Sequence, residues 1–271
     1  MSGDSLQDRV AIVTGGGGAI GGAMAHALAA AQVRVAVWDL RVDSAEERAL
    51  QIRDEGGTAC GVGCDVLDAD QVASALERTV SSLGPVDILI NGAGGSRKEA
   101  TTGPDRSFDE LLPADLLDTL SLNYLSAVLP CQAVAGTFAE RGRGVVLNIA
   151  SVAGILPLTR AVAYSSGKAA LINFTQWLAV HMAQEYSPAI RVNALAPGFV
   201  LTAQNRFLLV DETTGEPSER GRQILAAVPM SRYGQAQEMT GAMLWLVSDA
   251  ASYVTGAVIP VDGGLSANSG V

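Results

Sequence analysis

The sequence has little cysteine or histidine. Its 271 residues include three cysteines (Cys60, Cys64 and Cys131) and two histidines (His26 and His181). Three thiols are too few for a disulfide framework and suit a reduced, cytoplasmic protein. The two histidines supply little to complete a metal site beside Cys60 and Cys64, so we expect structural thiols and no bound metal.

Positive charge is also scarce. Lys and Arg together number 18 against 28 Asp and Glu, which gives a formal net charge of −10. Proteins that bind nucleic acid need a basic surface to neutralise phosphates, so we expect no nucleic-acid partner. An anionic small molecule would need local cations to offset the field of the acidic protein.

Long apolar runs are missing. No run approaches the length of a membrane span, so we expect no membrane partner. The segment MSGDSLQDRVAIVTG, residues 1–15, contains acidic residues and no long apolar core, unlike a signal peptide. Hydrophobic residues make up 48% and charged residues 17%, which excludes a disordered or fibrous chain. We expect one dinucleotide-binding and catalytic domain over residues 1–271.

Short apolar runs alternate with segments of helical periodicity. The runs cover residues 9–15, 33–39, 58–66, 86–92, 144–151, 190–197 and 257–264, and helical patterns follow the first three at 20–31, 44–56 and 69–84. Strands without polar alternation are buried on both faces, and helical crossovers indicate a parallel sheet. We therefore predict an α/β fold with a single Rossmann-type, doubly wound parallel sheet and helices on both faces.

Residues 202–229 interrupt this alternation. They insert polar and helical sequence between the last two predicted strands. A long insertion at the ligand-binding edge of such a sheet usually forms a substrate loop or lid. A solvated surface excursion is the alternative.

A glycine-rich segment, TGGGGAIGG at residues 14–22, follows the first strand and opens a helix. Glycines allow a tight turn there and let the backbone approach a pyrophosphate at the helix N-terminus. The loop alone is a weak signal, and the strand before it and the helix after it strengthen it. The residues predicted to bind the cofactor here are Thr14, Gly15, Gly18, Ala19, Ile20 and Gly21.

The second strand ends in Asp39. A carboxylate there can accept hydrogen bonds from the adenosine ribose and would repel a 2′-phosphate, so we expect NAD, with NADP less favoured. Arg41 argues for NADP, but we expect it to be exposed to solvent. The ends of the third and fourth strands meet the same edge of the sheet. The cofactor-binding residues predicted at these strand ends are Asp39, Leu40, Asp65, Val66, Asn91, Gly92 and Ala93.

Four polar residues lie in the second half of the pattern. Tyr164 and Lys168 are four positions apart on one predicted helix and therefore share a face. Ser151 stands thirteen positions before Tyr164, at the end of the fifth strand, and Asn123 lies within a long helix. Together with the motifs described above, they carry a family resemblance that implies a catalytic role for all four.

The order of these motifs resembles the short-chain dehydrogenase/reductase family across nearly the whole chain. The resemblance rests on the glycine-rich loop, on NGAG at residues 91–94, on the Ser-x12-Tyr-x3-Lys spacing and on PG at residues 197–198. Ala19 and Gly92 stand where the family more often has glycine and asparagine. The resemblance also implies that the nicotinamide-side loop binds the cofactor through Pro197, Gly198, Val200 and Thr202.

The resemblance implies a role for each catalytic residue. A free tyrosine titrates near pH 10, and a neighbouring ammonium together with an oxidised nicotinamide favours the phenolate. We therefore expect Lys168 to lower the pKa of Tyr164, and both residues to contact the cofactor. Tyr164 would then exchange the proton of the substrate hydroxyl while a hydride moves, and Ser151 would hydrogen-bond the substrate oxygen. Asn123 matches the family residue that anchors a proton-relaying water.

The substrate loop and the C-terminal tail resemble those of the D-mannonate oxidoreductases, also called fructuronate reductases. This implies a sugar acid such as D-mannonate or D-fructuronate. A carboxylate substrate needs cations, and guanidinium groups bind carboxylates through two hydrogen bonds. The candidates are Arg97, Arg160 and Arg206, and the alternative is that these arginines pair with acidic residues of the insertion such as Asp211 and Glu212.

Other functions stay open at this point. A reductase of 3-oxoacyl thioesters, or of neutral polyols and ketones, would share the same motifs. A non-catalytic dinucleotide-binding relative is a further alternative, although such a protein would be expected to have lost Tyr164 or Lys168. Two apolar helical segments, residues 127–139 and 171–183, favour self-association, and the resemblance implies a homotetramer formed through them and the last strand.

Overall fold

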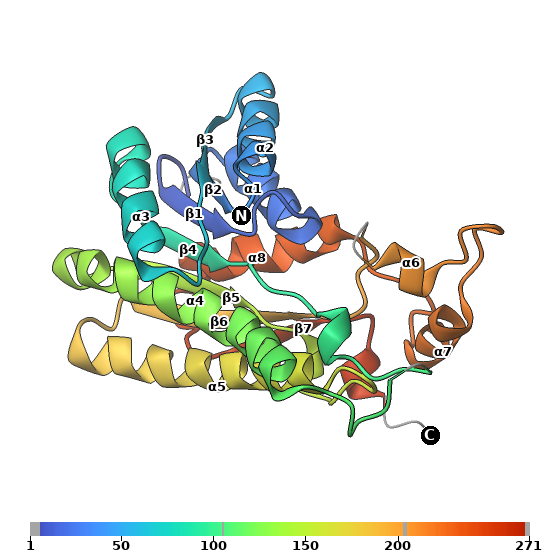
Figure 1. The fold of residues 1–271 in the computed structure, drawn as a ribbon. Coiled ribbons are helices and arrows are strands. Elements are labelled where there is room, and N and C mark those ends of the chain that lie inside the picture. The colour runs from blue at the N-terminus through green and yellow to red at the C-terminus, as the bar shows by residue number, and fades with distance from the viewer. Residues whose placement is uncertain (1–5, 105, 203–204, 269–271) are drawn as a thin grey trace.

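A seven-stranded parallel sheet forms the centre of the protein (Figure 1). The computed structural model describes residues 6–104, 106–202 and 205–268. The strand order is β3-β2-β1-β4-β5-β6-β7. The strands are β1 (Val10–Thr14), β2 (Arg34–Asp39), β3 (Thr58–Gly63), β4 (Ile88–Asn91), β5 (Gly144–Ile149), β6 (Ile190–Pro197) and β7 (Val258–Val261). The predicted α/β fold with a doubly wound parallel sheet is confirmed.

Helices cover both faces of this sheet. Ala, Leu and other good helix formers dominate their sequences, and Pro113 opens the longest one at a position where proline is tolerated. The helices are α1 (Ala19–Ala30), α2 (Val42–Asp54), α3 (Ala69–Leu83), α4 (Pro113–Arg141), α5 (Val162–Glu185), α6 (Arg206–Leu209), α7 (Glu219–Ala227) and α8 (Thr240–Val247).

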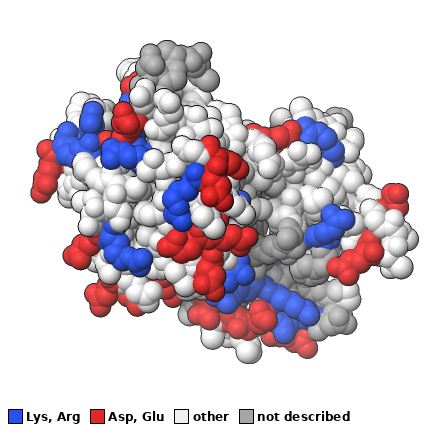
Figure 2. Space-filling model, turned by 90° about the horizontal axis from the view of Figure 1, so that it is seen from above, with Lys and Arg blue, Asp and Glu red and all other residues white. Residues whose placement is uncertain are grey.

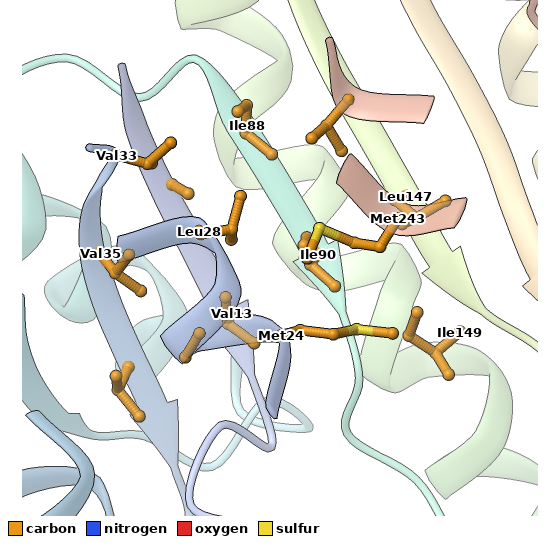
Figure 3. Close-up of a cluster of buried hydrophobic side chains, with 14 of the residues drawn as sticks. Val13, Met24, Leu28, Val33, Val35, Ile88, Ile90, Leu147, Ile149 and Met243 are labelled. Atoms are coloured by element: carbon orange, nitrogen blue, oxygen red, sulfur yellow. The ribbon is translucent and has the colours of Figure 1, made fainter. Parts of the chain in front are cut away.

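Each strand contributes side chains to two separate cores because successive residues point to opposite faces. Val13 and Val35 pack with α1, α2 and α8, whereas Ile12 and Trp38 pack with α3, α4 and α5. Figure 3 shows the first of these cores, in which Met24 and Leu28 of α1 lie over β1 and β4. Burial on both faces explains why the strands are mostly apolar and show no regular polar alternation.

The strand order reverses between β1 and β4. The chain moves outward from β1 to β3 in one direction and then returns to place β4 on the other side of β1. Thr14 and Asn91, the last residues of β1 and β4, are register partners. Ligands of doubly wound sheets bind at the carboxyl ends of the strands at such a reversal, so a ligand site is expected beside Thr14 and Asn91.

The insertion between β6 and β7 forms a lobe that stands out from the body of the molecule (Figure 1). The lobe comprises α6, α7 and the chain between them. Leu209, Val210, Ile224 and Val228 form a small apolar cluster of its own. The hydroxyl of Tyr233 also donates to the carbonyl of Leu209 at 3.2 Å. The lobe therefore has a small core of its own and is joined to the rest of the molecule through Tyr233.

Charged side chains of both signs are interspersed over the face shown in Figure 2. The acidic residues outnumber the basic ones in the chain as a whole. Within the described residues, none of the helices has the length and apolar character needed to cross a membrane.

Candidate active site

The glycine-rich loop forms the start of the site. Gly15 follows β1 with a φ of +64°, a left-handed conformation that favours glycine. Gly21 packs so tightly on this turn that a side chain there would collide with the carbonyl of Gly15. Gly18, the N-cap residue of α1, has no side chain that could cap the N–H groups of the first turn at Ala19 and Ile20. A helix N-terminus whose amides lack such partners fits a pyrophosphate.

Thr14 fastens this loop to the end of β4. Its hydroxyl oxygen accepts hydrogen bonds from the backbone N–H groups of Gly92 at 3.1 Å and Ala93 at 3.2 Å. A Cβ on Gly92 would lie 2.7 Å from the carbonyl oxygen of Thr14. The glycine at this position, which departs from the commoner family form, thus has a steric reason.

Asn91 turns its side chain into the protein and away from the cofactor edge. Its amide nitrogen donates to Asn148 Oδ1 at 2.8 Å and to Cys131 Sγ at 3.3 Å, and the residue is 2% exposed. Asn91 was predicted to bind the cofactor, but its side chain instead joins β4 to β5 and α4. Its main chain alone remains for a cofactor contact.

Asp39 closes the adenosine side of the loop. One carboxylate oxygen accepts from the N–H of Gly17 at 3.1 Å, and the other accepts from the N–H of Arg41 at 3.1 Å. The carboxylate keeps further lone pairs for ribose hydroxyls. Arg41 is exposed, as predicted. A negative group held at this point suits NAD and opposes a 2′-phosphate.

The three other residues predicted on this side are placed differently from one another. Leu40 is 72% exposed and leaves its apolar side chain open beside Asp39. One carboxylate oxygen of Asp65 accepts a hydrogen bond from the N–H of Leu67 at 2.9 Å. Val66 is buried in the second core. Leu40 and Asp65 are thus accessible to a nucleotide, whereas the side chain of Val66 packs in the core and leaves only its main chain for such a contact.

The loop after β6 is held by a residue that sequence reasoning missed. Asn205 accepts from the N–H of Thr202 at 2.8 Å and donates to the carbonyl of Val200 at 2.8 Å. Gly198 lies against β7, because its N–H donates to Val261 at 3.0 Å. Pro197 ends β6. The buried side chain of Val200 leaves only main chain for a carboxamide, and Thr202 is half-buried.

Tyr164, Lys168 and Ser151 come together at the junction of β5 and α5. A hydrogen bond joins the side chains of Tyr164 and Ser151. Lys168 Nζ lies 5.9 Å from the centre of the Tyr164 ring and donates to the carbonyl of Ile149 at 2.7 Å. Ser151 follows β5 and also accepts from the N–H of Ala153 at 3.1 Å. The predicted helical face and the predicted serine therefore meet.

The electrostatics of this group differ from the sequence-based expectation. Burial raises the pKa of Tyr164, and the hydrogen bond from Ser151 opposes this only in part. Burial also lowers the pKa of Lys168 from its ordinary 10.5 to about 8. The expected lowering of the tyrosine pKa by Lys168 was wrong for the protein alone, because desolvation disfavours the charged form of both groups.

Asn123 is fixed next to this group by the loop after β4. Its Oδ1 accepts from the N–H of Gly95 at 3.1 Å, and its Nδ2 donates to the carbonyls of Gly95 and Thr119, each at 2.8 Å. A Cβ on Gly94 would lie 3.0 Å from Asn123 Oδ1 and 3.2 Å from Lys168 Nζ. Gly94 thus occupies the space between the asparagine and the ammonium.

This loop also connects the two halves of the site. A Cβ on Gly15 would lie 3.0 Å from the Cα of Ala93, so the glycine-rich loop abuts the residue before Gly94. The same short segment therefore touches the phosphate-binding turn on one side and Lys168 on the other. A dinucleotide that spans from Asp39 to Tyr164 fits the order of these contacts.

The three arginines predicted to bind substrate do not gather at one point. Arg97, Arg160 and Arg206 are all exposed, and none of the three forms an ion pair with a described residue. Arg160 lies near a fourth arginine, Arg220 of α7, whose guanidinium donates to Thr159 Oγ1 at 2.8 Å. Sequence reasoning missed Arg220, since it had no motif to mark it.

Comparison with known proteins agrees with this geometry. A family model described as enoyl-(acyl carrier protein) reductase matches residues 17–266. A solved structure of a candidate D-mannonate oxidoreductase from Haemophilus influenzae, with bound NAD, is 38% identical, covers 98% of both chains and has a TM-score of 0.91. The chain belongs to the short-chain dehydrogenase/reductase family.

Two curated relatives match this chain over almost the whole length of both proteins. An uncharacterized oxidoreductase of Haemophilus influenzae is 38% identical over 278 residues, which is 98% of this chain and 96% of the relative. The uncharacterized oxidoreductase UxuB of Bacillus subtilis is 37% identical over 277 residues, 99% and 98% of the two chains. This short-chain dehydrogenase/reductase is therefore an oxidoreductase that acts on alcohol and ketone groups.

Replacement of Gly94 by alanine should impair catalysis more than folding. The added methyl group enters the space between Asn123 and Lys168, and the φ of +155° at Gly94 disfavours any side chain. We expect kcat to fall by about tenfold or more, because small displacements of positioned groups have large effects on rate. Steady-state kinetics measure this, with circular dichroism to check the fold and Gly103→Ala, where no atom lies near, as the control. Equal kcat for the two variants would contradict it.

Replacement of Lys168 by methionine should remove a pH dependence of stability. Between pH 8 and 10.5 the unfolded chain keeps a proton on Lys168 that the folded protein has lost. The free energy of unfolding of the parent protein therefore rises with pH relative to the variant, by on the order of 3 kcal/mol over this window. Urea unfolding of both proteins across the window tests this. Parallel pH profiles would show that the buried amine keeps its ordinary pKa.

Proposed function

We propose that this protein is an NAD-dependent oxidoreductase that interconverts the secondary alcohol and the ketone of a sugar acid such as D-mannonate or D-fructuronate. The observation that supports it most is the meeting of Ser151, Tyr164 and Lys168 at the end of β5, one short loop away from the glycine-rich turn. The sugar-acid part rests on the likeness to the NAD-bound Haemophilus influenzae structure.

The roles of the side chains follow from their positions. NAD, held at the glycine-rich loop and Asp39, would supply the oxidising power as the acceptor of a hydride from the carbinol carbon. Tyr164 takes the proton from the substrate hydroxyl in this direction and returns it in reduction. Ser151, whose hydroxyl is hydrogen-bonded to the phenol, would turn its single proton to the substrate oxygen and stabilise negative charge there. Lys168, fixed on Ile149, would favour the phenolate when it is protonated, together with the positive charge of the oxidised nicotinamide.

The proposal predicts a specific pattern of turnover. The purified protein with NAD and D-mannonate should produce NADH. Tyr164→Phe should reduce kcat by roughly a thousandfold while NAD still binds, since the phenol is needed to move the proton and the glycine-rich loop and Asp39 are untouched. NADH absorbance measures turnover, and protein fluorescence titration measures NAD binding. The same assays with NADP test the role of Asp39.

Other substrates decide between the alternatives. A preference for the neutral polyol D-mannitol, or for reduction of a 3-oxoacyl thioester with NADH, would refute the sugar-acid assignment. NAD binding without turnover of any of the three substrates would identify a non-catalytic relative and refute the proposal as a whole.

We also propose that the protein is a homotetramer that associates through α4, α5 and β7. Trp177 and Val180 on α5 are each 57% exposed, and Leu117 on α4 is 62% exposed. Rings on the same surface stack, with Trp177 4.8 Å from His181 between ring centres. β7 lies at the edge of the sheet and is only half-buried. A second copy would cover these apolar groups.

A charge placed on α5 should therefore break the assembly. Trp177→Glu should shift the mass in solution from that of a tetramer to that of a dimer or monomer, because it buries a carboxylate in an apolar contact. Light scattering after size exclusion measures the mass. Leu50→Glu on α2, where the side chain is 51% exposed, is the matched control and should leave the tetramer intact. A monomeric parent protein would contradict the proposal.

The proposed compartment is the cytoplasm. Cys60, Cys64 and Cys131 are free thiols. Burial raises the pKa of Cys64 to about 11 and that of Cys131 to about 12, so both stay protonated and unreactive at neutral pH. Unpaired, inert thiols suit a reducing compartment.

A further inference from the structure

Two arginines lie where the lobe touches the segment before Tyr164. Arg220 is the second residue of α7, and its guanidinium reaches across to donate to Thr159 Oγ1 at 2.8 Å. Arg160 is the next residue after Thr159. Burial and, after it, the positive charge of Arg160 lower the pKa of Arg220. The structure thus holds two like charges close enough to repel each other.

The backbone at Arg160 is fixed in an unusual conformation. Its φ is +75°, a left-handed value that is uncommon for residues other than glycine. The carbonyl of Arg160 accepts from the N–H of Thr102 at 3.0 Å, which anchors the residue to the chain after β4. Such strain is found mainly at functional sites, where surrounding contacts impose it.

No described carboxylate neutralises this pair. The arginines in ion pairs within the described ranges are Arg9, Arg53, Arg141, Arg143 and Arg232. The carboxylate of Asp211, an alternative partner, accepts instead from the N–H groups of Thr213 and Thr214.

We propose that Arg160 and Arg220 together bind the carboxylate of the sugar-acid substrate, while Thr159 orients the guanidinium of Arg220. This inference rests on the proposed function and identifies which cations recognise the acid. Each guanidinium offers a planar pair of donors that matches a carboxylate. The lobe contributes Arg220 to this site, and the exposed Arg206 on α6 takes no part in it.

Binding of the acid also connects the lobe to the catalytic segment. The carboxylate neutralises two charges that otherwise repel, one from α7 and one from the chain four residues before Tyr164. A neutral polyol leaves that repulsion in place. The pair therefore selects acids over polyols, and it does so in substrate binding.

Kinetics of charge-removing variants test the pair. In Arg160→Gln and Arg220→Gln, kcat/KM for D-mannonate should fall by about tenfold to a hundredfold, mainly through KM, because each loses a charged hydrogen bond. Turnover of D-mannitol should stay within about twofold, since a neutral substrate makes no such bond. The double variant should lose less than the product of the single losses, as expected for residues that share one ligand.

Matched controls lie on the same lobe. Arg222→Gln on α7, whose side chain bonds the carbonyl of Pro217, and Arg206→Gln should both behave as the parent protein. If Arg160→Gln and Arg220→Gln lose no more than these controls, the pair does not bind the carboxylate, whatever the substrate. A loss in Arg206→Gln alone would also overturn the inference.

A binding measurement separates this inference from the proposed function. Calorimetric titration of D-mannonate into Tyr164→Phe saturated with NAD needs no turnover. D-mannonate binding should disappear in the double variant Tyr164→Phe/Arg220→Gln and persist in Tyr164→Phe/Arg222→Gln. This result would support carboxylate binding by Arg160 and Arg220 even if the parent protein oxidises another acid. No binding of D-mannonate to Tyr164→Phe or to the parent protein would overturn the pair together with the sugar-acid assignment.

Discussion

The buried ammonium of Lys168 fixes the geometry of the site. The residue is 4% exposed, and its Nζ donates to the carbonyl of Ile149 at the end of β5. An ammonium in the interior is costly unless it is hydrogen-bonded, so helix α5 must keep this position over the strand. The same nitrogen lies beside the Tyr164 ring and next to Gly94. One contact thereby sets the tyrosine, the lysine and the loop after β4 relative to each other.

A second set of buried polar contacts supports the same junction from within the core. Asn91 on β4 donates to Asn148 on β5, and Asn148 donates to Thr175 Oγ1 on α5 at 2.8 Å. Buried amides need specific partners, so these bonds favour one lateral arrangement of the two strands and the helix. Because the loops of the site leave β4 and β5 just beyond this network, the network positions residues that it does not touch.

The sequence predicted the parts of the site that depend on local pattern. Apolar strands, the glycine-rich turn and the four-residue spacing of Tyr164 and Lys168 follow from backbone periodicity, which a sequence records directly. The direction of the Asn91 side chain and the pKa of Tyr164 could not be predicted, because they depend on burial by elements distant in the chain. Desolvation raises the pKa of Tyr164 more than the hydrogen bond from Ser151 lowers it, and no spacing in the sequence reports desolvation.

Arg220 was missed for the same reason. It lies 61 positions from Thr159, and only the folding of the lobe brings the two side chains together. The net charge of −10 gives this pair its significance. The chain has many more carboxylates than cations, yet no described carboxylate forms an ion pair with Arg160 or Arg220. Their repulsion without one is an unfavourable contribution that a bound anion would relieve. If the proposed pair binds the substrate, the same repulsion would favour an acid over a neutral polyol.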